Sequence, residues 1–154
     1  MPITEDMRLV RRSAAAPPVP PNADEAQWAL VETVHEGGPI WVRRNLALEP
    51  LLAAPSHPLL LSVTVEGETA DPEQLAILGG FEEALFGILG SEGLCWPAAV
   101  VTQEHARHFL LYARERAPLV PRLAFLKQEF PLDFEPALQH DPDWADFRRL
   151  PGRT

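Results

Sequence analysis

The sequence predicts an α+β fold, and three observations support this prediction. Residues 59–66 alternate between two faces with the period of a β-strand. Residues 71–89 follow with apolar side chains at the three-to-four spacing of an amphipathic helix. From residue 58 onward the predicted elements run strand, helix, strand, strand, helix, strand, so strands and helices are expected to share one core.

A proline-rich segment precedes these elements. Residues 14–16 are all alanine, and four prolines lie between positions 17 and 21. This composition favours extended polyproline II and gives little to pack, so we predict a flexible tail over residues 1–26 and a single domain over residues 27–154. A proline-rich segment can also bind an aromatic groove on a partner, and that alternative stays open.

An extra N-terminal β-hairpin is predicted for residues 27–45. Trp28, Leu30 and Val34 lie at alternating positions of a first strand, and the turn signal Gly37-Gly38 separates it from a second strand over residues 40–45. Residues 46–57 contain two prolines and no periodic pattern, so an irregular connector is expected there.

The first helix has a clear start. Asp71 is expected to cap it and Pro72 to occupy its first position, where the missing N–H is no loss. Gly79 and Gly80 fall inside the helix, and each destabilises it by about 1 kcal/mol relative to alanine. A kink or a close approach to the sheet is therefore expected at this pair.

The second half repeats the pattern. Residues 95–102 and 106–113 predict a hairpin, and residues 118–130 a second helix. Residues 132–138 predict an edge strand, because Pro136 cannot donate to a neighbouring strand. Residues 141–150 predict a short C-terminal helix capped by Asp141. The whole order is that of a ferredoxin-like strand-helix-strand-strand-helix-strand sandwich with two additions, the N-terminal hairpin and the C-terminal helix.

Composition and charge exclude several partners. The net charge is −9 and the arginines occur at most in pairs, whereas nucleic-acid binding relies on clustered cations. No apolar run approaches the roughly 20 residues that span a bilayer. Cys95, the one cysteine, is expected to be a buried small hydrophobe, and no secretory signal is evident, so we expect a cytoplasmic location.

The sequence shows no recognisable catalytic or metal-binding set. His105 and His108 are three apart on a strand and should point to opposite faces, so no metal is expected there. The aspartates at 141, 143 and 146 lack the glycine and glutamate that a calcium loop requires. The serines lack the setting of a nucleophile. We therefore expect no metal or cofactor, and the sequence favours a binding role over catalysis without deciding between them.

One polar set could converge on a sheet face. Arg43 and Asn45 end the second predicted strand, and Arg107 and Tyr112 lie on the later hairpin. These side chains would either form a surface for an anionic or peptide ligand or pair across strands with neighbouring carboxylates. The candidate carboxylates are Glu32, Glu66 and Glu104.

The same residues carry a resemblance. Over roughly residues 28–147 the chain resembles the bacterial "domain of unknown function 695" family, in Arg43-x-Asn45, in the hairpin with Arg107 and Tyr112, and in the ending Asp141-x-x-Trp144-x-x-Phe147. It departs from the family at two positions. His105 stands where the turn usually has glycine, and Phe147 stands where tyrosine is usual, which removes a hydroxyl.

The resemblance implies a fold and a kind of role. The family has no established activity, but some members are fused to a domain similar to the regulator of ribonuclease activity B, an acidic ferredoxin-like inhibitor that binds a basic segment of a ribonuclease. A shared fold does not transfer function. The resemblance and the net charge together favour an interaction or regulatory module. Its acidic surface and the exposed Trp144 and Phe147 would contact a basic protein partner. The alternative is a small-ligand binder or enzyme with Arg43, Arg107, Tyr112 and Asp143 in a pocket against the sheet. The oligomeric state stays open.

Overall fold

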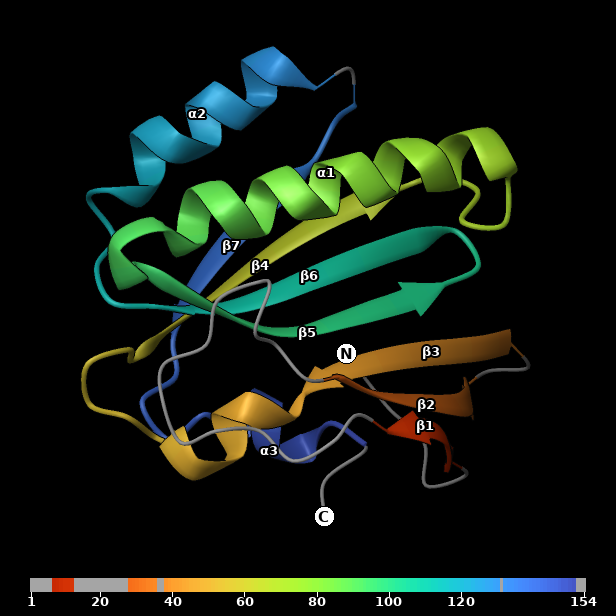
Figure 1. Cartoon of the computed structure of the whole chain (residues 1–154), viewed down its shortest axis with the longest axis horizontal. Helices are drawn as coiled ribbons and strands as arrows, with labels where there is room; N and C mark the ends of the chain where they lie inside the picture. The colour runs from red at the N-terminus through yellow and green to blue at the C-terminus, as the bar shows by residue number, and fades with distance from the viewer. Residues whose placement is uncertain (1–6, 13–27, 36–37, 131, 152–154) are drawn as a thin grey trace.

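The structure is a computed structural model, and it describes residues 7–12, 28–35, 38–130 and 132–151 (Figure 1). Its strands are β1 (Met7–Arg12), β2 (Trp28–His35), β3 (Gly38–Asn45), β4 (Leu59–Glu66), β5 (Cys95–Gln103), β6 (Ala106–Ala113) and β7 (Glu135–His140). Its helices are η1 (Leu46–Leu51), α1 (Pro72–Gly90), η2 (Ser91–Gly93), α2 (Leu119–Glu129) and α3 (Ala145–Arg149). The fold is therefore α+β.

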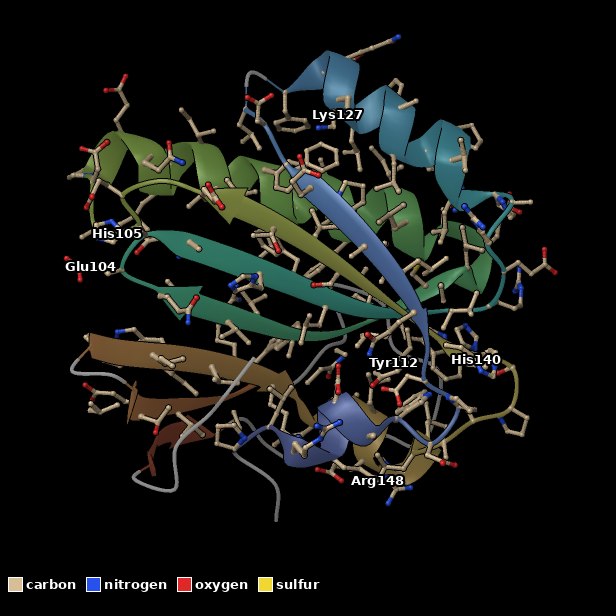
Figure 2. All side chains as sticks on the ribbon, turned by 180° about the vertical axis from the view of Figure 1, so that it is seen from behind. Glu104, His105, Tyr112, Lys127, His140 and Arg148 are labelled. Atoms are coloured by element: carbon tan, nitrogen blue, oxygen red, sulfur yellow. The ribbon has the colours of Figure 1, made fainter. Side chains whose placement is uncertain are left out.

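All seven strands form one sheet in the order β1-β2-β3-β5-β6-β4-β7, and every neighbouring pair is antiparallel. The helices α1 and α2 lie over one face of the sheet (Figure 1). We call this the α1 face. Side chains from η1 and α3 pack on part of the opposite face. We call this second face the open face, because the rest of it carries no helix in Figure 2.

The predicted strand over residues 59–66 and the predicted first helix are confirmed. Leu61, Val63 and Val65 of β4 are buried in the core beneath α1, as the alternation indicated. The side chain of Asp71 accepts a hydrogen bond from the backbone N–H of Gln74 at 3.1 Å, and Pro72 begins the helix. This register places the even-numbered residues of β4 on the open face.

The close approach expected at Gly79 and Gly80 is wrong. A Cβ added at either position would meet nothing within 4 Å, and α1 is continuous from Pro72 to Gly90. Both glycines lie on the exposed side of the helix, where no neighbouring residue requires a position without a side chain.

Replacing Gly79 or Gly80 by alanine should therefore stabilise the protein. We expect each change to raise the free energy of unfolding by about 0.5–1 kcal/mol, because alanine loses less backbone entropy and fits the open space. Urea unfolding measures it. Gly67→Ala is the control and should destabilise, because Gly67 has φ +144° and an added Cβ would lie 3.1 Å from the Gln74 side chain. A loss of stability at both helix positions would contradict the prediction.

The second half of the chain follows the prediction with shifted bounds. The β5-β6 hairpin and α2 are confirmed, and β7 is an edge strand, with Pro136 opposite Val63. The strand begins at Glu135 instead of residue 132, because Phe134 is buried in the helix-covered core before the strand pairing starts. The helix α3 is shorter than expected, because Trp144 has a left-handed backbone with φ 53°.

Two connecting segments also differ from expectation. Residues 46–51 form the 3-10 helix η1 instead of an irregular connector, and three of its residues are buried. Met7–Arg12 form β1 and pair with β2, so a flexible tail over residues 1–26 is wrong for this stretch. The short apolar run there was too weak to reveal a strand whose pairing partner lies on β2. The rest of the predicted tail lies outside the described residues.

Candidate functional site

The structure divides the predicted site residues between the two faces of the sheet. Arg107 lies opposite Val65, and Arg43 lies opposite Val100. Because Val65 and Val100 belong to the core beneath the helices, both arginines extend from the α1 face. Tyr112 packs on the open face. The predicted set therefore does not form one pocket.

Tyr112, Trp144 and Phe147 are core residues. Trp144 is stacked on Tyr112 with ring centroids 4.3 Å apart, and neither is exposed. The Tyr112 hydroxyl donates to Asp141 Oδ2 at 2.8 Å and accepts from the Phe147 N–H at 3.3 Å. Burial and the hydrogen bond to Asp141 raise the pKa of Tyr112. The expectation that Trp144 and Phe147 are exposed docking residues is wrong, because the left-handed turn at Trp144 directs both rings into the sheet.

The other predicted site residues have local partners or stand apart. The buried Asn45 side chain donates to the Pro97 carbonyl at 2.7 Å and accepts from the Ala47 N–H at 3.0 Å, which begins η1. Arg43 forms an ion pair with Glu82 of α1 instead of with a carboxylate on a neighbouring strand. Asp143 is exposed in the turn before α3. Asn45 is therefore structural, and Asp143 lies apart from Arg43 and Arg107.

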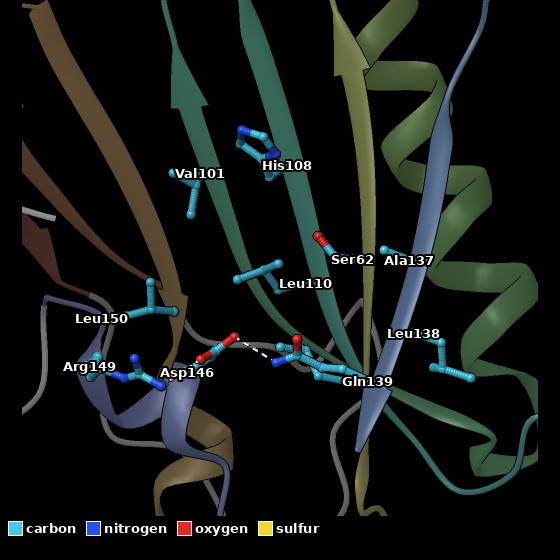
Figure 3. Close-up of a pocket in the computed structure, with 11 residues that line it drawn as sticks. Ser62, Val101, His108, Leu110, Ala137, Leu138, Gln139, Asp146, Arg149 and Leu150 are labelled. Carbon is cyan, nitrogen blue, oxygen red and sulfur yellow. Dashed lines mark hydrogen bonds and ion pairs between the residues drawn. The ribbon is translucent and has the colours of Figure 1, made fainter. Parts of the chain in front are cut away.

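The open face carries a pocket of about 630 Å³ that sequence reasoning did not find (Figure 3). We call it the sheet-face pocket. It lies between α3 and β7, above the middle of β4, β5 and β6 (Figure 3). It is lined by Leu60, Ser62, Val101, His108, Leu110, Ala137, Leu138, Gln139, Asp146, Arg149 and Leu150. Its floor is mostly apolar, and its polar groups come from five of these residues.

His108 is the titratable group on the pocket floor. Its Nδ1 lies 2.9 Å from the Thr64 hydroxyl and its Nε2 3.1 Å from Oε1 of Gln103. An amide oxygen can only accept, so Nε2 carries the proton and Nδ1 accepts from Thr64. Burial lowers the pKa of His108, partly opposed by Glu66, so the ring is neutral at pH 7. With both nitrogens engaged, the ring is held in place and has no lone pair for a substrate proton.

The rim of the pocket joins α3 to the edge strand. Asp146 accepts from Gln139 Nε2 at 2.9 Å and forms an ion pair with Arg149 at 2.8 Å (Figure 3). The two charges neutralise each other. Arg149 is 72% exposed, so its side chain is free to reorient at little energetic cost.

The sequence held a partial signal for this pocket. The face of β4 opposite the core carries Ser62 and Thr64, and the adjacent strand carries His108. These residues become neighbours only in the strand order β6-β4-β7. The pocket also requires α3 to pack beside them. Neither follows from local periodicity.

Comparison with known proteins adds no relative. No family model matches the sequence, and neither the curated proteins nor the solved structures give a match. The resemblance to the "domain of unknown function 695" family therefore stays a prediction.

Other chemistry is limited within the described part of the chain. No group of three His, Cys, Asp or Glu side chains there is placed to hold a metal ion. No helix among those residues is long and apolar enough to cross a membrane. Cys95 is buried, as predicted, and burial raises its pKa to about 12, so the thiol stays protonated.

Proposed function

We propose that this protein binds a small amphipathic molecule in the sheet-face pocket and does not transform it. The observation that carries the proposal is the pocket itself, whose volume of about 630 Å³ and apolar floor with a few polar groups are typical of ligand sites. Leu110 and Ala137 offer an apolar surface to the ligand body. Ser62 and Gln139 offer hydrogen bonds to its polar end.

Charge and geometry favour an uncharged ligand and a binding role. The ionic groups of the rim, Asp146 and Arg149, form a neutral pair, and His108 on the floor is neutral at pH 7. General acid-base work requires a side chain that can exchange a proton with the substrate. Both nitrogens of His108 already have protein partners. This ring therefore contributes to the shape of the pocket and does not exchange a proton with the ligand.

We also propose that the domain has a ferredoxin-like architecture. Two features support this assignment. The elements from β4 to β7 run strand, helix, strand, strand, helix, strand, and their four strands have the order β5-β6-β4-β7. The β2-β3 hairpin continues this sheet at one side.

A thermal-shift screen of small amphipathic metabolites against the full chain tests the proposal. A ligand present at 100 times its Kd should stabilise the folded state by about 2.7 kcal/mol, which raises Tm by several degrees. Ala137→Phe should abolish the shift, because Ala137 is exposed on the edge strand and a larger side chain there fills the pocket without entering the core.

Two arginines of α3 provide a matched control. Arg149→Gln should weaken ligand binding, since Arg149 lines the pocket. Arg148→Gln removes the same charge one position earlier, where the side chain is exposed and turned to Asp143, and should leave binding unchanged. Ligand shifts that persist in Ala137→Phe would contradict the proposal.

The net charge of −9 supports a second proposal, a cytoplasmic interaction module with a basic protein partner. Capture from native lysate at low and then moderate salt tests it. Recovery of a basic protein that salt releases is the expected result, and recovery of none would contradict it.

A further inference from the structure

Arg107 has a buried donor without a partner. Its Nε atom is shielded from solvent and makes no hydrogen bond to any residue that the structure describes. A guanidinium group has five N–H donors, and buried polar groups in native proteins are almost always hydrogen-bonded. Because Nε is enclosed, an acceptor from outside the chain would reach Arg107 at the terminal guanidinium nitrogens, and the residue as a whole is half-buried.

The charges around Arg107 leave room for one more negative charge. Its pKa is lowered mainly by burial and then by Arg43, and Glu82 opposes these effects. Glu82 is already engaged in an ion pair with Arg43, whose guanidinium also lies over the Trp28 ring at 5.4 Å. Two guanidinium groups and one carboxylate give this cluster a net charge of +1. A monoanion would neutralise it, whereas a dianion would leave a net charge of −1 beside Glu82.

The strand register supplies the neighbours of such an anion. Trp41 lies opposite Thr102, and Thr102 lies opposite Arg107, across three adjacent strands. Paired residues of antiparallel strands share a face, so an indole ring, a hydroxyl and a guanidinium form a row on the α1 face. Trp41 is 38% exposed, so part of its ring is open to a ligand.

We propose that Trp41, Thr102 and Arg107 form a binding site for a monoanionic carboxylate that carries an aromatic or aliphatic group. The carboxylate accepts hydrogen bonds from the Arg107 guanidinium and the Thr102 hydroxyl, and the apolar group stacks on Trp41. The site is separate from the sheet-face pocket, because His108, the next residue along β6, points to the open face.

Nuclear magnetic resonance of the arginine Nε–H groups tests the site directly. Phenylacetate is titrated into the full-length ¹⁵N-labelled protein at constant ionic strength, and the Arg107 signal is the one missing in Arg107→Lys. We expect this signal to shift saturably while the signal of exposed Arg116 stays in place. Phenylacetate should bind about fivefold tighter than acetate through the aromatic contact, and Trp41→Ala should remove that difference.

Three further probes separate the site from non-specific binding. The neutral 2-phenylethanol should leave the Arg107 signal unmoved. The dianion phenyl phosphate should bind more weakly than phenylacetate, and Glu82→Gln should reverse that order. Arg107→Met should keep or raise the urea midpoint while losing carboxylate binding, which shows that the variant is folded.

A linear, unsaturated shift shared by all arginine signals would overturn the proposal, as would an equal response to the neutral alcohol. Failure here leaves the sheet-face pocket untouched, since Ala137→Phe and Arg107→Met alter opposite faces of the sheet.

Discussion

Trp144→Ala should lower the free energy of unfolding by about 3–5 kcal/mol, the range for removing a large buried aromatic side chain. The indole is fully buried, stacks on Tyr112, and donates from Nε1 to the His57 carbonyl at 2.9 Å. The substitution leaves both a cavity and an unpaired carbonyl. Urea unfolding followed by far-ultraviolet circular dichroism measures the loss.

Trp41→Ala is the matched control, because Trp41 is partly exposed on the α1 face. It should change the free energy of unfolding by less than about 1 kcal/mol. If the two tryptophan variants were equally stable, Trp144 would not be the core residue that the structure shows.

Arg44→Met should lower the free energy of unfolding by about 3 kcal/mol, because breaking a buried ion pair leaves its partner groups without compensation. The Arg44 side chain is completely buried and bonds Glu49 at 2.9 Å. It also donates to the carbonyls of Phe147 and Leu150 and covers the Phe147 ring at 3.8 Å. Methionine keeps the packing volume but supplies no donor. Chemical denaturation at pH 7 gives the difference.

Arg43→Met tests whether the effect is specific to burial. Arg43 is the preceding residue on β3, its side chain is 33% exposed, and it forms an ion pair with Glu82. Partly exposed pairs contribute about 1 kcal/mol or less, so this variant should stay close to wild type. A loss of less than about 1 kcal/mol for Arg44→Met would show that α3 does not depend on this contact.

The local patterns predicted the elements well where interactions between residues close in sequence determine the backbone. Alternation located β4, and Asp71-Pro72 located the start of α1, since capping and fixed φ act within a few residues. The patterns failed where tertiary contacts decide the backbone. Trp144 adopts a left-handed conformation that shortens α3, and its ring is fully buried against Tyr112. No propensity indicates that conformation for a tryptophan.

The candidate sites were harder to predict because they depend on which face a residue takes and on which strands become neighbours. Arg43 and Arg107 were predicted to belong to one polar set on a sheet face, and the structure links them through Glu82 of α1. Helical periodicity alone does not place Glu82 beside either arginine. His108 was considered only as a metal ligand, and its setting between Thr64 and Gln103 required the strand register.

The long-range contacts of Arg44 also bear on the order of folding. Its hydrogen bonds to Phe147 and Leu150 span 103 and 106 positions of the chain, whereas each hairpin closes locally. Loop-closure entropy opposes such distant contacts until the sheet exists, so α3 should dock after the transition state. Weakening that docking would then leave the folding rate almost unchanged and accelerate unfolding, which makes α3 the element that sets the lifetime of the native state.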